Sequence, residues 1–301
     1  MIDNFDNLLK VAKKRGPKKI SIACAEDRDI LKAVKYATKE KIVTPILVGD
    51  KEKIENIAKD IDFDITSFDL YDYKTMKDSA KKAVKLVSSG EADMLMKGLI
   101  DTSKILKAAL NKEYGLRTGR VLSHVAVFDV ENYHKLLFVT DAAMNIAPSL
   151  DQKKDIIQNS LEVVKAVDID TPKVGVICAK EKVVEKMPCT VEADKLVKMN
   201  ENGKIKDCIV GGPFALDNAV SKKAAEIKGI KHEAAGDCDV LLCPDIEAGN
   251  ILYKSLNFLC NAKSAGMIVG ATAPIVLTSR ADSDEAKLNS IALGTLMSAN
   301  K

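Results

Sequence analysis

The sequence predicts an α/β protein with mostly parallel β-sheets, and three observations support this fold class. Short apolar runs alternate with charged amphipathic segments along most of the chain, as strands alternate with crossover helices. Of the 301 residues, 47% are apolar and few are aromatic, which suits a core of aliphatic side chains. No fixed-period repeat interrupts the alternation. We therefore expect one large or two medium α/β domains.

The first part of the chain contains short buried strands separated by amphipathic helices. We expect strands at 19–25, 45–48 and 93–96, and helices near 27–40, 50–60, 74–89 and 102–111. Parallel strands need crossover connections of a dozen or more residues, which are usually helical. This order of elements therefore predicts βαβ units.

A hairpin is expected where the first series ends. The apolar runs 121–130 and 135–140 face each other across the short joint Glu-Asn-Tyr-His. We interpret this hairpin as the start of a second domain. A second βα series follows it, with helices expected at 150–167, 190–199 and 215–227 and strands at 173–179, 207–210 and 239–243.

The charge balance and the amino terminus argue against two classes of partner. Forty-six basic and 43 acidic residues leave a formal charge of +3, and the lysines are spread along the expected helices, so nucleic-acid binding is unsupported. The start of the chain lacks the pattern of a signal peptide, and no apolar run approaches the ~18 residues of a membrane span. We expect a cytoplasmic protein that binds no membrane.

Metal and cysteine chemistry are not indicated. The seven cysteines include no Cys-x-x-Cys pair and the three histidines are scattered, so we expect neither a zinc site nor a Cys-His pair. The first strand is not followed by Gly-x-Gly-x-x-Gly, and there is no Walker loop. Nicotinamide and nucleoside triphosphate enzymes of the usual kinds are therefore disfavoured.

Two segments near the carboxyl terminus carry the polar residues expected of a binding site. Residues 239–254 predict an apolar strand that ends in an acidic turn, passes Gly249-Asn250 and enters a helix. Residues 273–287 repeat that plan, because a short apolar run brings Thr278, Ser279 and Arg280 into a turn before the last helix, 283–299. In an open parallel sheet, loops at the carboxyl ends of strands form the ligand crevice.

The second segment predicts an anion site. Arg280 offers a planar fork of donors, Ser279 adds a hydroxyl, and the following helix presents free backbone N–H groups. The alternative is that Asp282 only caps that helix, with Glu285 as its capping-box partner, and that Arg280 is a surface residue.

Several ordered motifs carry a family resemblance. They are MKGLIDT at 96–102, LLFVTDAAMNIAPS at 136–149, VGGPFALD at 210–217, PDIEAGNILYK at 244–254 and LTSRADSDEAKL at 277–288. With these motifs the chain resembles the phosphate acetyl/butyryltransferase family, and the runs around Asn145 and Arg280 are most similar to its butyryl-transferring branch. The resemblance covers nearly the whole chain and is weakest over roughly the first 90 residues.

The resemblance implies a fold and a reaction. The implied fold has two three-layer αβα domains like those of isocitrate and isopropylmalate dehydrogenases, with a cleft between them and the last helix returning to the first domain. The implied domains are 1–130 with 267–301, and 131–266. The implied reaction transfers a short acyl group, butyryl before acetyl, between CoA and inorganic phosphate by direct attack. The substrates are then CoA, acyl-CoA, phosphate and acyl phosphate. No cofactor or metal is expected. We also expect the protein to form a homo-oligomer.

The resemblance also implies roles for particular residues. Ser279 and Arg280 are expected to hold the phosphate and the oxyanion, and Asp282 to serve as the base, with Asp284 and Glu285 as alternatives. The residues expected to bind substrate are Thr140, Asp141, Asn145, Asn250, Lys254 and Thr278. Asn250 and Lys254 lie four apart and so share one helix face that CoA could contact.

The sequence departs from the family pattern at two places. The position of the family's catalytic aspartate falls near Ala286, which is why three carboxylates stay open as the base. An arginine that the family has on the helix after the first-domain glycine turn is absent, and Lys97, Lys104 or Arg120 could supply its charge.

Two other functions stay open, namely an acyl-CoA-binding module without turnover and, more distantly, a dehydrogenase of the same architecture.

Overall fold

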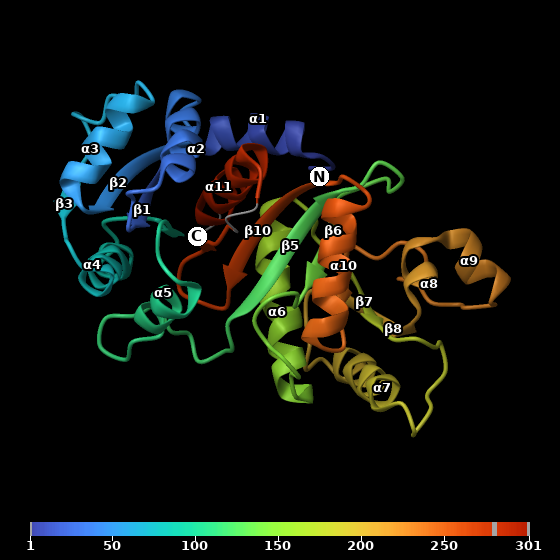
Figure 1. The fold of residues 1–301 in the computed structure, drawn as a ribbon. Coiled ribbons are helices and arrows are strands. Elements are labelled where there is room, and N and C mark those ends of the chain that lie inside the picture. Colours follow the sequence, from blue (N-terminus) through green and yellow to red (C-terminus); the bar gives the residue numbers. More distant parts are fainter. Residues whose placement is uncertain (1, 279–281, 300–301) are drawn as a thin grey trace. The chain divides into compact units, whose positions relative to one another are not determined.

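The computed structural model describes residues 2–278 and 282–299, and the described chain forms two compact units. The N-terminal unit comprises Phe5–Arg120 and Ala265–Lys301, and the central unit comprises Met1–Asn4 and Val121–Ser264. Figure 1 shows the helices and strands of both units. The domain limits at 130 and 266 that the sequence suggested stay a prediction.

The N-terminal unit contains a six-stranded part of the sheet in the order β3-β2-β1-β4-β11-β10. The strands are β1 (Lys18–Ala23), β2 (Val43–Gly49), β3 (Leu70–Asp72), β4 (Met94–Lys97), β10 (Lys263–Val269) and β11 (Ile275–Val276). All neighbours are parallel except β10 and β11. The α/β class with mostly parallel strands is thus confirmed in this unit, whereas β3 and β10 were not expected from the sequence.

Helices cover this sheet in two groups. They are α1 (Phe5–Arg15), α2 (Arg28–Lys39), α3 (Lys51–Asp60), α4 (Met76–Ser88), α5 (Thr102–Ala109) and α11 (Asp284–Ala299). Helix α2 contacts α3 and α11, α11 contacts α1, and α4 contacts α5, while α2, α4 and α11 also contact strands. These contacts give three layers. Side chains of Asp27, Asp50 and Thr75 accept backbone N–H groups at the starts of α2, α3 and α4, which explains where these helices begin.

The central unit contains the strand order β5-β6-β9-β7-β8. Its elements are β5 (Ser123–Asp129), β6 (Leu137–Thr140), α6 (Leu150–Ala166), β7 (Lys173–Ile177), α7 (Pro188–Glu201), β8 (Ile209–Phe214), α8 (Leu216–Val220), α9 (Lys222–Ile227), β9 (Val240–Leu242) and α10 (Ile246–Phe258). The predicted hairpin is confirmed, because β5 and β6 pair antiparallel, and the other neighbours are parallel.

Two predicted elements of the central unit differ in detail. The helix expected at 215–227 is broken into α8 and α9, because Ser221 has an extended backbone and its hydroxyl accepts the N–H of Ala224 as the cap of α9. The helix expected after Gly249-Asn250 already begins at Ile246, because Asp245 accepts the N–H of Ala248 (2.9 Å). Gly249 and Asn250 therefore lie inside α10.

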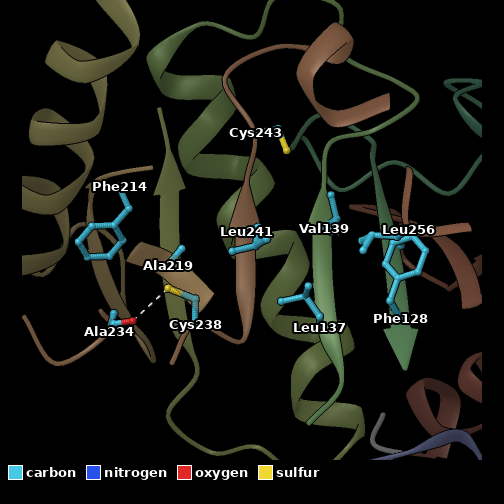
Figure 2. Packing of buried hydrophobic residues seen from close by; sticks show 11 residues of the cluster. Phe128, Leu137, Val139, Phe214, Ala219, Ala234, Cys238, Leu241, Cys243 and Leu256 are labelled. Atoms are coloured by element: carbon cyan, nitrogen blue, oxygen red, sulfur yellow. Dashed lines mark hydrogen bonds between the residues drawn. The ribbon is translucent and has the colours of Figure 1, made fainter. Parts of the chain in front are cut away.

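An apolar cluster holds the central unit together (Figure 2). It joins side chains of β5, β6, β8, β9 and α10, among them Phe128, Val139, Phe214, Leu241 and Leu256, and Phe128 and Val139 are fully buried. Burying a side chain such as Phe or Leu contributes about 1.5–3 kcal/mol. The cluster explains why the alternating apolar pattern of these strands is stable in this register. No helix among the described residues is long and apolar enough to cross a membrane.

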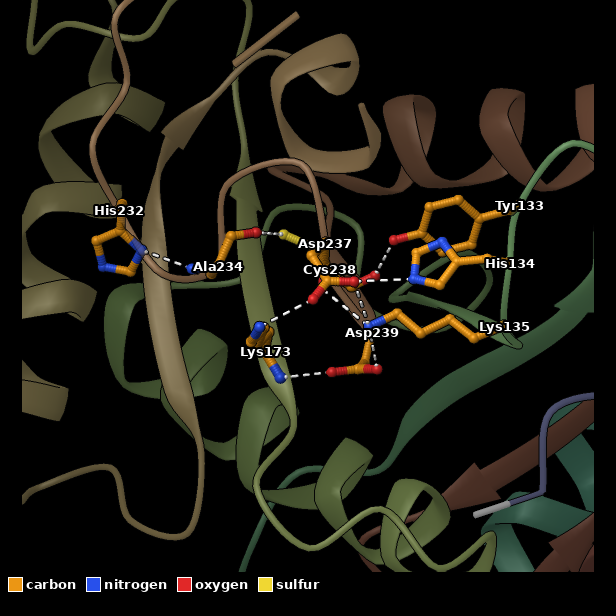
Figure 3. A network of polar contacts seen from close by, with 9 residues as sticks. All are labelled: Tyr133, His134, Lys135, Lys173, His232, Ala234, Asp237, Cys238 and Asp239. Carbon is orange, nitrogen blue, oxygen red and sulfur yellow. Dashed lines mark hydrogen bonds and ion pairs between the residues drawn. The ribbon is translucent and has the colours of Figure 1, made fainter. Parts of the chain in front are cut away.

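A buried ion network fixes the amino-terminal ends of β6, β7 and β9 (Figure 3). The Lys135 ammonium, 8% exposed, lies 2.7 Å from Asp239 Oδ1 and 3.1 Å from Asp237 Oδ1. Lys173 Nζ lies 2.8 Å from Asp237 Oδ2, and Asp239 Oδ2 accepts the backbone N–H of Lys173 at 2.7 Å. Tyr133 adds a hydrogen bond from its hydroxyl to the carbonyl of Cys238 (2.6 Å). The ion pairs thus join three segments that are distant in the sequence.

Asp237 makes this network sensitive to acid. Burial alone raises the pKa of the Asp237 carboxyl, but hydrogen bonds from Lys173 and Lys135 outweigh it and hold that pKa well below the usual value. A folded-state pKa below the unfolded one gives stability that is present above about pH 4 and is lost as the pH falls further. The network therefore stabilises the central unit at neutral pH.

We predict that Asp237→Asn lowers the free energy of unfolding by about 3 kcal/mol at pH 7, because it leaves two lysines without their shared carboxylate. The difference from wild type should shrink below about pH 4. Chemical denaturation at several pH values measures both. The control is Asp194→Asn, which removes only a surface pair with Lys198 and should change stability by less than about 1 kcal/mol. Equal effects of the two variants at pH 7 would contradict the assignment.

Candidate functional site

The sheet register of the N-terminal unit brings polar residues together at the carboxyl ends of its strands. Strand β4 ends at Lys97, and its neighbour β11 ends at Val276, with Val276 beside Met96. Thr278 therefore emerges next to Lys97 and Gly98. Strand β1, on the other side of β4, leads into the turn that ends at Asp27. This arrangement is expected of a ligand site in a parallel sheet.

A cavity of about 160 Å³ lies at this edge. Its walls are formed by Asp27, Asp29, Ile30, Lys97, Gly98, Thr278 and Lys287. Thr278 is therefore placed at the cavity. Ser279 and Arg280, the residues expected to hold phosphate, lie outside the described residues.

The start of α11 corrects the capping alternative for Asp282. The Ser283 hydroxyl accepts the N–H of Ala286 (3.1 Å) and the Ser283 carbonyl accepts the N–H of Lys287 (3.1 Å), so Ser283 occupies the cap position. Asp282 therefore does not cap the helix through Glu285. Its backbone carbonyl instead accepts a hydrogen bond from Lys287 Nζ (2.6 Å), and its side chain is partly exposed. Asp282 stays a candidate base.

Asp284 and Glu285 occupy a different position from Asp282. Both are exposed in the first turn of α11, where acidic side chains interact favourably with the helix dipole. This position accounts for them without a catalytic role. It leaves the choice among the three carboxylates where the sequence left it, with Asp282 preferred.

The three cations that could replace the missing arginine lie in different surroundings. Lys97 is 8% exposed and lines the cavity. Lys104 is exposed on α5, and its Nζ lies 2.8 Å from Asp101. Arg120 is partly exposed just before the chain enters the central unit. Of the three, Lys97 alone lines this cavity.

Sequence reasoning missed Lys287, which also lines the cavity and is 3% exposed. It lies in the fourth position of α11. One signal was available, because a lysine near the start of a helix opposes the helix dipole and is unusual there. In the sequence it appears within the motif LTSRADSDEAKL.

In the central unit, strand register brings the predicted substrate residues of two loops together. Strands β6 and β9 are parallel neighbours, with Thr140 beside Leu242, so the loops that follow them emerge side by side. Gly249 in α10 lies against the first of these loops, because a Cβ at this position would be 2.2 Å from the carbonyl oxygen of Asp141. The Asn250 amide then donates to the carbonyl of Ala142 (3.1 Å). The helix and the loop therefore form one packed edge.

Asp141 organises this loop from the inside. Its Oδ1 accepts the N–H groups of Ala143 (2.9 Å) and Met144 (3.0 Å), and its Oδ2 accepts from the backbone and side chain of Asn145 (3.2 and 2.5 Å). Asn145 also donates to the carbonyl of Leu122 (2.9 Å). Both oxygens of the buried carboxylate are thus committed, so Asp141 is a positioning residue for the loop.

The remaining predicted residues of the central unit differ in exposure. Thr140 is fully buried and its hydroxyl donates to the carbonyl of His124 (2.9 Å), so its side chain holds the strand pair. Asn250 and Lys254 are exposed on α10. The Lys254 ammonium lies over the rings of Tyr253 (5.3 Å) and Phe258 (5.6 Å). Of these, only the α10 residues offer side chains to solvent.

Four of the seven cysteines are poorly suited to nucleophilic attack. Burial raises the pKa of the thiols of Cys208, Cys238 and Cys243 to about 12. Burial, followed by the neighbouring Cys189 side chain, does the same for Cys178. A thiol with such a pKa supplies almost no thiolate at neutral pH. Among the described residues, no group of His, Cys, Asp and Glu side chains is arranged to hold a metal ion.

Comparison with known proteins places this architecture. A branched-chain phosphotransacylase from Enterococcus faecalis superposes with a TM-score of 0.81 at 34% identity, over 93% of this chain and 99% of that one. A 4-hydroxythreonine-4-phosphate dehydrogenase from Burkholderia phymatum shares only the fold, with a TM-score of 0.56 and 15% identity over 93% and 98% of the two chains. The fold is therefore that of phosphotransacylases and is related to a dehydrogenase fold, as the resemblance implied.

The sequence comparisons identify the family. The phosphate acetyl/butaryl transferase family matches residues 4–80 and 73–295, so the chain belongs to that family. The phosphate butyryltransferase of Clostridium beijerinckii is 50% identical over 299 residues, which cover 99% of each chain. The phosphate acetyltransferase of Thermotoga maritima is 44% identical over 97% of this chain and 99% of its own.

We predict that Asp141→Asn lowers the free energy of unfolding by about 2 kcal/mol, because one acceptor oxygen becomes an NH₂ group that faces backbone N–H donors. Thermal or chemical unfolding measures the change. The control is Asp151→Asn in the exposed first turn of α6, which should cost about 0.5 kcal/mol or less. Wild-type stability of Asp141→Asn would show that the loop does not depend on this carboxylate.

Proposed function

We propose that the chain transfers a short acyl group between CoA and inorganic phosphate, with butyryl-CoA as the preferred thioester. The observation that carries this proposal is the 50% identity, over nearly the whole of both chains, to a phosphate butyryltransferase. The 34% identical structural relative is described as a branched-chain phosphotransacylase, which also supports an acyl chain longer than acetyl.

The geometry of each unit supports the same reaction. The N-terminal unit offers a small cavity with two lysines and Thr278 directly before Ser279 and Arg280 in the sequence, which suits an anion. The central unit offers the exposed Asn250 and Lys254 beside a loop that Asp141 makes rigid, which suits a larger substrate. Phosphate and acyl-CoA are a small and a large substrate of this kind.

The proposed reaction is a direct attack of a phosphate oxygen on the thioester carbonyl. The new carbon–oxygen bond forms first and turns the carbonyl oxygen into an oxyanion; the carbon–sulfur bond then breaks as the carbonyl reforms, and the CoA thiolate leaves. Arg280 holds the phosphate, and Ser279 with backbone amides stabilises the oxyanion at the carbonyl. In the reverse direction a carboxylate, with Asp282 preferred, takes the proton of the CoA thiol. The high pKa of the buried thiols favours this route over an acyl-cysteine intermediate.

The proposal also covers location and partners. No cofactor or metal takes part, because arginine and lysine can offset the charge that phosphate brings. We place the enzyme in the cytoplasm and expect a homo-oligomer. Acetyl transfer is the second candidate, because the acetyltransferase of Thermotoga maritima is 44% identical. Binding of acyl-CoA without turnover is the candidate from another class.

We predict that butyryl-CoA and phosphate together release free CoA thiol, that butyryl-CoA alone does not, and that acetyl-CoA is a poor substrate. Each methylene in an apolar pocket is worth roughly 10- to 200-fold in specificity, so two should separate the substrates by over about a hundredfold. The kcat/KM values for acetyl-, propionyl-, butyryl- and hexanoyl-CoA at one phosphate concentration test this. An acetyl value equal to the butyryl value would favour the acetyltransferase alternative, and no thiol release with any thioester would favour the binding module.

We predict that Arg280→Lys reduces phosphate use severely while the fold stays intact. Lysine keeps the charge but loses the two-pronged donor geometry, which is worth about 1.5–3 kcal/mol, or roughly 10- to 150-fold in kcat/KM for phosphate. Steady-state kinetics with phosphate as the varied substrate measure this, with circular dichroism as the check of folding. Wild-type turnover and apparent phosphate affinity in this variant would show that Arg280 does not bind the phosphate.

A further inference from the structure

The cavity of the N-terminal unit contains two lysines that are more than nine-tenths buried. Lys97, at the end of β4, is 8% exposed, and Lys287, in the first turns of α11, is 3% exposed. Both residues line the same cavity of about 160 Å³. Burial removes hydration from the positive charge of a lysine, so an anion bound in this cavity would stabilise the charged form of both.

The other buried lysines of the described chain show how such a charge is neutralised internally. Lys135 contacts Asp237 and Asp239, and Lys153 contacts Glu192 in a close ion pair. Lys287 has a different environment. Its Nζ donates to the carbonyl of Asp282 (2.6 Å), and the one carboxylate within 4 Å in the described residues is that of Asp284, at 3.9 Å.

The Asp284 carboxylate neutralises Lys287 only weakly. The Asp284 side chain is 65% exposed, so water screens its attraction to the buried ammonium. A carbonyl oxygen satisfies one N–H donor of an ammonium group that has three. The charge and the remaining donors of Lys287 are therefore available to a ligand in the cavity.

The acidic residues of the cavity wall do not remove the case for an anion. Asp27 caps α2, and its Oδ1 accepts the N–H groups of Asp29 and Ile30, both at 3.0 Å, so the start of this helix stabilises its charge. Asp29 is exposed, so water screens the charge of its carboxylate. A carboxylate at the rim can also accept a hydrogen bond from the P–OH group of hydrogen phosphate.

The size of the cavity indicates which anion fits. A water molecule takes about 30 Å³ of liquid volume, so about 160 Å³ admits a small tetrahedral oxyanion. Sites for drug-sized ligands are roughly 300–1,000 Å³, so the cavity is too small for a nucleotide or a whole CoA molecule. Thr278, which is 4% exposed, supplies a hydroxyl group in the same wall.

We propose that Lys97 and Lys287 together bind the phosphate dianion of the reaction, as inorganic phosphate in one direction and as the phosphoryl group of the acyl phosphate in the other. This inference rests on the proposed function and adds a subsite to it. The two lysines match the two negative charges of the ligand. They thereby reduce the repulsion between the phosphate and the phosphates of CoA, which must approach it.

The experiment measures phosphate binding and phosphate kinetics in Lys97→Met and Lys287→Met. Methionine keeps most of the apolar stem of lysine and removes the charge. Each variant should weaken binding of inorganic phosphate, measured by calorimetry without acyl-CoA, by about tenfold or more. The KM for phosphate should rise by a similar factor, while the KM for butyryl-CoA changes by less than about threefold. The matched control is Lys32→Met, an exposed lysine of α2 outside the cavity, which should leave all three quantities unchanged.

Three results would overturn the inference. The first is wild-type phosphate affinity in both methionine variants, which would mean that the lysines are neutralised within the protein. The second is a rise in the KM for butyryl-CoA with no change in that for phosphate, which would assign the lysines to the phosphates of CoA. The third uses the wild-type protein and so applies even if a variant fails to fold. It is a Tm that phosphate raises no more than chloride does at equal ionic strength.

The same measurements separate this inference from the proposed reaction. If the wild-type protein binds phosphate through the two lysines but releases no thiol from any acyl-CoA, the subsite stands and the reaction is wrong. If thiol release requires phosphate but the methionine variants keep wild-type phosphate affinity and KM, the reaction stands and the subsite is wrong.

Discussion

The need to neutralise buried charge is the constraint on which both units depend. In the central unit, Lys135 and Lys173 share Asp237, and this network joins the amino-terminal ends of three strands into one framework. In the N-terminal unit, Lys287 is 3% exposed, and among the described residues its Nζ contacts the carbonyl of Asp282 and, at 3.9 Å, the exposed carboxylate of Asp284. Breaking a buried ion pair costs about 3–5 kcal/mol, so a protein retains an incompletely neutralised lysine at a real loss of stability. The neutralised lysines of the central unit therefore serve stability, whereas the incompletely neutralised Lys287 fits the proposed ligand site.

Parallel pairing decides where the polar residues meet. Because β4 and β11 are parallel neighbours, Lys97 and Thr278 emerge together although they are far apart in the sequence. The parallel pairing of β6 and β9 does the same for the Asp141 loop and α10. The ion network of the central unit lies at the amino-terminal ends of its strands, whereas the Asp141 loop and α10 follow the carboxyl ends of β6 and β9. The ion network and the predicted substrate residues therefore lie at opposite ends of the strands in that unit.

The fold class, most helices and the hairpin could be predicted from the sequence because their signals are local. Apolar alternation and amphipathic periodicity are visible within a dozen residues, and Asp27, Asp50 and Thr75 mark helix starts directly. Strand β3 was missed because Leu70 and Tyr71 are only partly buried and Asp72 is exposed. The break at Ser221 was missed because one residue decides it. The cavity could not be predicted, because Lys97 and Lys287 meet only through the packing of α11 against the sheet. The roles of Ser279 and Arg280 stay predictions from the sequence.

The close contact between Gly249 and the carbonyl of Asp141 has a consequence for protein engineering. The loop 141–147 and helix α10 touch at a point where there is no room even for a methyl group, and they are also joined by the amide of Asn250. An exchange of one segment alone that placed any side chain at position 249, or moved the carbonyl of Asp141 toward it, would force the two backbones apart. The loop and the helix should therefore be transplanted as one cassette, and chimeras designed to change the substrate range should have their crossover points outside both.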